Sequence, residues 1–153
     1  MDIERYIEVN TTLGRVDIEK GNQHYFTKLA SLYEIGIGRI DWKKNGFEKY
    51  ISIENLSKEN KLARLEEFCT SVLLGMSTNN SVKIFADGYL EDVYLIPSDF
   101  LTDFLKYCID LPQHLYVLFE NESCLNYTWE EDLFFGYPKN YKNQRFAITG
   151  RKA

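Results

Sequence analysis

The sequence predicts an α+β fold in which a largely antiparallel sheet, built of hairpins, carries about three helices on one face. Three observations support this prediction. Three segments have apolar residues at helical spacing, the segments between them alternate with a period of two, and short turn signals such as Asp87-Gly88 join neighbouring strands. The 153 residues contain no Pro/Gly/Ser linker, so we expect a single domain covering residues 1–153.

The first third of the chain is expected to hold one helix among short strands. The helix begins after Asn22, a suitable N-cap, and Gly36 ends it. Phe26, Leu29 and Tyr33 recur along it at spacings of three to four. The expected strands are Ile3–Val9, Arg15–Glu19, Ile35–Trp42 and Phe47–Ile53, the last two turning at Asn45-Gly46.

Two further helices and four strands are expected in the rest of the chain. One helix begins at Ser57 and closes at Gly75, with an apolar stripe between them. The other has Ser98 as its cap and ends before Pro112. The expected strands are Val82–Ala86, Tyr89–Ile96, Leu115–Phe119 and Leu125–Trp129.

Negative charge is concentrated in the middle of the chain. From Asp87 to Asp132 there are eleven acidic residues and one basic residue, Lys106. Residues 1–86 balance twelve acids against twelve bases, and residues 133–153 contain five bases and no acid. Thirteen of the 23 aromatic residues lie between Phe85 and Tyr137. Carboxylates interleaved with aromatic rings suit a surface for a basic partner, because charge steers the encounter and flat rings anchor it.

The candidate partner-binding residues follow from this pattern. The strand assignment places two acids at one end of a hairpin and an acidic, Trp-containing group at the other end, while Asp99 and Asp103 share one face of the third helix. An exposed Trp129 beside three successive acids would be a binding hot spot; the alternative is a core Trp followed by an acidic loop. The candidates are Asp99, Asp103, Glu120, Glu122, Trp129, Glu130, Glu131 and Asp132.

Catalytic functions have less support in the sequence than partner binding. Asp41 and Lys43, with Asp17 upstream, loosely resemble the acid-x-Lys element of metal-dependent nucleases, but a strand end followed by a turn explains them equally. Cys124 could be activated by His114 across a hairpin, although acidic surroundings favour the neutral thiol. No zinc-ligand cluster and no glycine-rich nucleotide loop is present, so we expect no cofactor and no metal.

The bulk properties narrow the choice of partner. Net acidity argues against direct binding of nucleic acid, because phosphate contacts need clustered Lys and Arg. No apolar stretch approaches the ~18 residues of a membrane span, and no secretory signal is visible. Three scattered cysteines suit free thiols in a reducing compartment. We therefore expect a cytoplasmic protein, with the basic tail Lys139–Lys152 either folded onto the acidic region or extended.

In size, acidity and its acidic, aromatic segment 87–132, the chain resembles the immunity proteins of bacterial polymorphic-toxin systems, including contact-dependent growth inhibition. The resemblance implies a protein that binds one cognate basic toxin domain, often a nuclease, and blocks it. Two alternatives remain. One is an inhibitor whose carboxylates imitate DNA phosphates and so block a host defence nuclease, and the other is a small enzyme with a dispersed active site.

Overall fold

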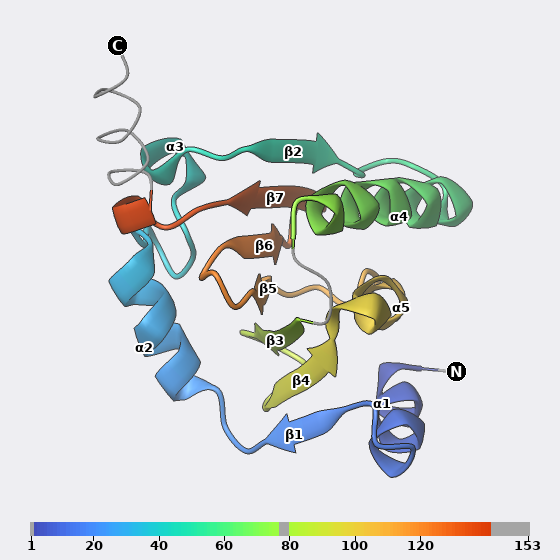
Figure 1. Cartoon of the computed structure of the whole chain (residues 1–153). Coiled ribbons are helices and arrows are strands. Elements are labelled where there is room, and N and C mark those ends of the chain that lie inside the picture. Colours follow the sequence, from blue (N-terminus) through green and yellow to red (C-terminus); the bar gives the residue numbers. More distant parts are fainter. Residues whose placement is uncertain (1, 77–79, 142–153) are drawn as a thin grey trace.

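A seven-stranded antiparallel sheet forms the centre of the molecule (Figure 1). The structure is a computed structural model and describes residues 2–76 and 80–141. Across the sheet the strands follow the order β1-β4-β3-β5-β6-β7-β2. This arrangement confirms the expected α+β class. The strands are β1 Asp17–Glu19, β2 Lys49–Ser52, β3 Ser81–Ala86, β4 Val93–Pro97, β5 Leu115–Leu118, β6 Cys124–Tyr127 and β7 Asp132–Gly136.

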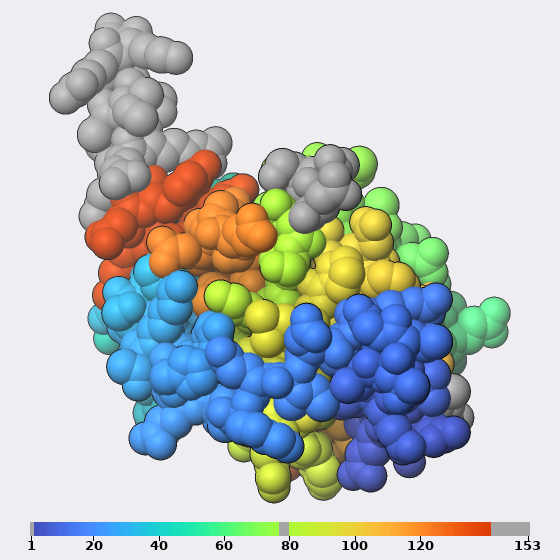
Figure 2. Space-filling model, turned by 60° about the horizontal axis from the view of Figure 1, so that its bottom comes forward, coloured from blue at the N-terminus to red at the C-terminus, as the bar shows by residue number. Residues whose placement is uncertain are grey.

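Helices cover both faces of the sheet, so the expectation that they lie on one face is wrong. In chain order they are α1 Ile3–Thr12, α2 Gln23–Leu32, α3 Trp42–Asn45, α4 Lys58–Leu74, the 3-10 turn η1 Ser98–Phe100 and α5 Leu101–Lys106. One packing layer holds α1, α4 and α5, and the other holds α2 and α3. Figure 2, seen from the side of β1, shows α1 (dark blue) and α2 (light blue) on either side of that edge. All four residues of β5 are buried, and a strand buried on both faces needs a layer on each.

The segment expected as the strand Ile3–Val9 is the helix α1. Asp2 caps it, because its carboxylate accepts a hydrogen bond of 2.8 Å from the backbone N–H of Arg5. The buried residues Ile3, Tyr6, Ile7 and Asn10 follow helical spacing, which places them on one face. The buried Asn10 amide donates to the Tyr6 carbonyl and so satisfies its polar group within the helix.

The expected strand Ile35–Trp42 is also absent. Only an isolated bridge joins Ile35 to Ile40, and the chain then enters α3. The Asn45 side chain holds this loop, since its Oδ1 accepts from the Glu34 N–H at 2.9 Å and its Nδ2 donates to the Glu34 carbonyl at 2.8 Å. Gly46 ends α3 with a φ of 74°, a conformation that favours glycine.

β4 and β6 differ from their expected boundaries, and β7 was not expected. β4 begins at Val93, later than the expected Tyr89, because the side-chain Oε1 of the buried Gln113 accepts the N–H groups of Tyr89 and Leu90 and holds them in a loop. β6 ends at Tyr127, before the expected Trp129. The sequence pattern did not indicate β7, which pairs with β6 and with β2.

The remaining elements lie where the sequence indicated. β1 and β2 fall inside their expected ranges, and α2 and α4 begin after Asn22 and Ser57. The expected third helix comprises η1 and α5, but the expectation that Ser98 caps it is wrong, because Ser98 is the first residue of η1 and Pro97 occupies the N-cap position. The Ser57 hydroxyl caps α4 by accepting from the Asn60 N–H. None of the described helices combines the length and apolar character that crossing a membrane requires.

Candidate functional site

The turn between β6 and β7, Thr128–Glu131, presents Trp129 to solvent. The Trp129 side chain is 61% exposed, so it is a surface residue and not part of the core. Tyr127, just before the turn, is buried and its hydroxyl donates to the Ile109 carbonyl at 2.8 Å. The chain therefore passes from a fixed core residue directly to an exposed indole. We call Thr128–Glu131 the Trp129 turn.

Each of the three acids after Trp129 is held by a different part of the chain. The Glu130 carboxylate accepts two hydrogen bonds from one nitrogen of Arg39, at 2.7 and 2.8 Å. Glu131 forms an ion pair of 2.5 Å with Lys61, whose side chain is only 18% exposed. The Tyr50 hydroxyl donates to Asp132 at 2.9 Å. The acids expected to receive a partner's cations are thus already occupied within the molecule.

Backbone hydrogen bonds close the same turn. The Glu131 N–H donates to the Thr128 carbonyl, and the Thr128 N–H donates to the Asp132 carbonyl, each at 2.9 Å. The hydroxyl of Thr128, a buried residue, accepts from the Asp132 N–H at 3.1 Å. Glu131 adopts a φ of 64°, which is uncommon for a non-glycine residue and is sustained here by the surrounding contacts. The turn is therefore fixed from the backbone as well as from the side chains.

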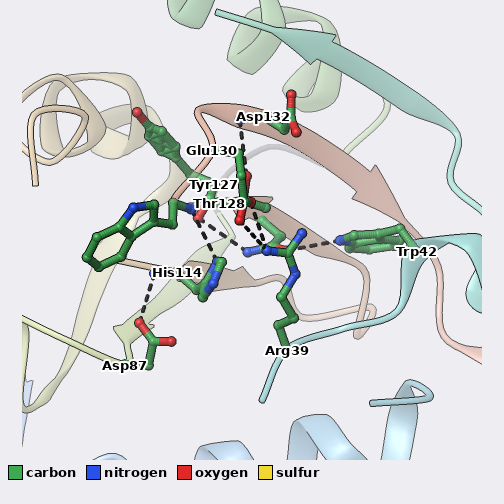
Figure 3. A network of polar contacts seen from close by, with 10 residues as sticks. Arg39, Trp42, Asp87, His114, Tyr127, Thr128, Glu130 and Asp132 are labelled. Carbon is green, nitrogen blue, oxygen red and sulfur yellow. Dashed lines mark hydrogen bonds and ion pairs between the residues drawn. The ribbon is translucent and has the colours of Figure 1, made fainter. Parts of the chain in front are cut away.

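His114 connects the turn to the β3–β4 loop (Figure 3). Its Nδ1 accepts the Trp129 N–H at 3.2 Å, and its own backbone N–H donates to the Asp87 carboxylate at 2.8 Å. Burial lowers the pKa of His114 below its usual 6.5, and the opposing effect of Asp87 does not reverse this. The lowered pKa favours the neutral imidazole, which is the form that can accept the Trp129 N–H.

Arg39 also controls the charge state of its partner. Burial raises the pKa of the Glu130 carboxyl, but the hydrogen bonds from Arg39 outweigh burial and hold the pKa below the usual 4.5. The ion pair therefore persists as pH falls into the range where exposed carboxyls begin to protonate. The carboxylates of this turn, expected to bind a partner, instead make contacts within the molecule that hold the turn in place.

The other four candidate residues lie elsewhere. Glu120 and Glu122 occupy the β5–β6 turn at the opposite end of the hairpin, where Glu122 lies 3.9 Å from Lys28 and Glu120 accepts the Ser81 N–H. Asp99 is in η1 and Asp103 in α5, and both are exposed. The structure thus places the eight candidates at both ends of the sheet. Of the expected basic tail, Lys139 lies 3.8 Å from Glu34, and residues 142–152 fall outside the described residues.

The two catalytic alternatives are not assembled. Cys124 pairs with Leu118 at one end of the β5–β6 hairpin, whereas His114 precedes β5 at the other end. Cys124 is fully buried, and burial raises the pKa of its thiol. Asp17 lies in the edge strand β1, while Asp41 caps α3, which stacks on β7 near the far edge through Trp42 and Phe134.

Sequence reasoning missed an aromatic pocket of ≈ 630 Å³ beside β2. Trp42 lies at its base, stacked on Phe134 with ring centroids 5.6 Å apart, and its Nε1–H donates to the buried Asn126. Phe47 and Tyr50 line the pocket and are 47% and 45% exposed. Ile37, which lies between Gly36 and Gly38, is the residue in the sequence that could have indicated this pocket. Its side chain is fully exposed, because neither neighbouring glycine has a side chain to cover it.

These contacts define a rigid turn bearing an exposed indole and, separately, an aromatic hollow. Both are features of surfaces that bind other molecules. Across residues 2–76 and 80–141, no group of three His, Cys, Asp or Glu side chains converges as a metal site would require. Comparisons with protein-family models, curated proteins and solved structures found no match to this chain.

Proposed function

We propose that this protein is an immunity protein that binds a cognate basic toxin domain and blocks it, with Trp129 as the central anchor. The observation that carries the proposal is the exposed indole on a turn fixed by Arg39, Lys61 and His114. Binding energy at protein interfaces is concentrated in a few residues, among which Trp and Arg are the most frequent. A turn already fixed before binding loses little conformational entropy when the partner docks.

The acidic composition supports a basic partner in a different way from the one the sequence pattern indicated. A net charge of −5 attracts a cationic protein at long range and raises the association rate. At short range the Glu130 and Glu131 carboxylates are engaged by Arg39 and Lys61, so their role is to hold the turn. An Arg or Lys of the partner would then lie over the Trp129 ring as a cation–π contact.

The proposal is tested by comparing the wild-type protein with Trp129→Ala. Proteins captured from the source cell lysate by each are compared at low and high salt, and the terminal domain of any protein lost with Trp129→Ala is expressed alone. We expect that domain to arrest growth, the wild-type protein to restore it, and Trp129→Ala to bind it at least tenfold more weakly. Trp129 is the sharper target than Glu130 or Glu131, because changing either acid also breaks an ion pair of the turn.

Leu74→Ala is the matched control. Leu74 is a large apolar residue, 82% exposed at the end of α4 and away from the Trp129 turn, and its removal should leave binding and growth rescue unchanged. Equal capture by wild type and Trp129→Ala would contradict the role of Trp129. A captured partner with no effect on growth would contradict the immunity function itself.

A further inference from the structure

The edge strand β2 has backbone groups that no other strand in the described part of the chain uses. Among the residues that the structure describes, β2 is the last strand of the sheet and pairs only with β7. The Ile53 N–H donates to the Glu131 carbonyl at 2.9 Å, so by antiparallel alternation Ile51 also faces β7, and the N–H and C=O groups of Tyr50 and Ser52 point away from the sheet. An open row of this kind can pair with another extended chain.

Pockets lie on both faces of this edge. Tyr50 lines the aromatic pocket on one face, together with Phe47 and Phe134. Ile51 lines a second pocket of ≈ 400 Å³ with Phe68 and Arg64 of α4. Because successive side chains of a strand point to opposite faces, a strand added beside β2 would place alternate side chains at the two pockets. An open edge with a pocket on each face fits β-strand addition.

The two pockets are lined by acidic as well as basic side chains. Asp41 accepts the Lys44 N–H, Glu67 is paired with Arg64, and Glu48 lies next to Lys49 in the chain. Lys43 at the aromatic pocket and Lys49 on β2 form no ion pair within the described residues, whereas Arg39 and Lys44 in the same pocket wall are paired with Glu130 and Glu34. An added strand that carries carboxylates would neutralise these two lysines. Pairing of β2 with β2 of a second copy of this chain is disfavoured, because β2 itself, Lys-Tyr-Ile-Ser, offers a further lysine and no acid.

We propose that β2 binds an extended segment of another protein by strand addition, with bulky apolar side chains at the two pockets and acidic residues beside Lys43 and Lys49. The proposal concerns a surface separate from the indole of Trp129 and stands without the function proposed above. Backbone pairing at Tyr50 and Ser52 supplies the affinity, and the pockets with the two lysines supply the choice of sequence.

The test is selection of a displayed random dodecapeptide library on the full chain. Selected peptides are then measured against Ser52→Pro, which removes an outward N–H without removing a bond to β7, and against Ser52→Ala, which keeps that N–H. We expect selected sequences that alternate apolar and acidic residues. Ser52→Pro should weaken their binding tenfold or more, while Ser52→Ala and Trp129→Ala should bind them as the wild type does.

A second variant keeps the proposal open to refutation if Ser52→Pro does not fold. The double substitution Lys43→Glu with Lys49→Glu reverses the two unpaired charges and should shift the selection from acidic to basic peptides. An unchanged selection, equal binding by Ser52→Pro, or no enriched peptide would overturn the proposal. A wild-type dimer that Ser52→Pro converts to a monomer would also overturn it, by assigning the edge to a second copy of this chain.

Discussion

The buried side-chain amide of Asn126 holds Trp42 at the base of the aromatic pocket, and Asn126 lies in the strand that leads into the Trp129 turn. Its Oδ1 accepts the Trp42 Nε1–H at 3.0 Å, and its Nδ2 donates to the Leu115 carbonyl at 2.9 Å. Asn126 is in β6, two residues before the Trp129 turn, and Trp42 lies at the base of the aromatic pocket. A buried polar group left without its partner is costly, so this amide fixes the position of Trp42 against the sheet.

Replacing this amide should therefore destabilise the protein. Asn126→Ala leaves the Trp42 N–H without its partner and removes the side-chain hydrogen bond to the Leu115 carbonyl, and we expect the free energy of unfolding to fall by about 2–4 kcal/mol in urea denaturation. Trp42→Phe removes the donor, so the double variant should lose less than the sum of the two single losses. Asn140→Ala, at an exposed position, is the control and should stay within about 0.5 kcal/mol of the wild type. Additive losses would show that the two side chains are not coupled.

At the scale of elements, the sequence predicted those with strong local signals. Asn22 and Ser57 occupy the N-cap positions of α2 and α4, although only Ser57 makes a capping hydrogen bond, and regular apolar stripes mark both helices. It did not predict β7, because Leu133, Phe134 and Phe135 are apolar on both faces and show no alternation. It predicted a strand where α1 forms, because the stripe of Ile3, Tyr6 and Ile7 is short. Short apolar runs do not separate helix from strand by periodicity alone, and long-range packing decides them.

The candidate site shows the same division between local and long-range information. The sequence left open whether Trp129, at the end of a strand, is exposed or belongs to the core, and the structure places it at the surface. It did not indicate that Arg39 and Lys61, distant along the chain, would neutralise the neighbouring acids. Charge counted along a sequence does not reveal ion pairs between remote segments. The sequence therefore overstates how many acids of residues 87–132 are available to a partner.

The link between His114 and the Trp129 turn predicts a pH effect on stability. Burial holds the folded-state pKa of His114 below 6.5, so as pH falls through 6.5 the unfolded chain binds a proton that the folded chain resists. The contribution to the free energy of unfolding is therefore complete above pH 6.5 and is lost as pH falls toward the folded-state pKa. Urea unfolding of wild type and His114→Gln from about pH 8 to about pH 5 measures this. Stability should fall more steeply with acid in the wild type, and parallel curves would contradict the prediction.

At the scale of the whole molecule, one sheet serves two packing layers. Strands β3, β4, β5 and β6 contribute side chains to both layers, for example Ile84 to one and Phe85 to the other. The same architecture disperses the acids of residues 87–132 around the sheet, where Asp92, Asp110 and Glu122 lie beside Lys20, Lys58 and Lys28. The candidate binding surfaces are therefore the exposed aromatic groups and the open edge of β2. The acidic residues act mainly through the net charge of the chain.

Sharing the sheet should make the two layers unfold together, and the buried cysteines can report on this. Cys69 and Cys108 lie in the layer of α1, α4 and α5, and Cys124 lies in the layer of α2 and α3. Burial raises the pKa of Cys69 to about 12 and also raises that of Cys124, so neither folded thiol supplies the reactive thiolate. Pulse alkylation along a urea gradient, read by mass spectrometry, should give Cys69 and Cys124 the same midpoint, because neither layer retains its core without the shared strands.

A Leu74→Cys variant, exposed in the folded state, is the control and should react at every urea concentration. Labelling of Cys124 at lower urea than Cys69 would instead show that the α2 and α3 layer, with its aromatic pocket, opens on its own.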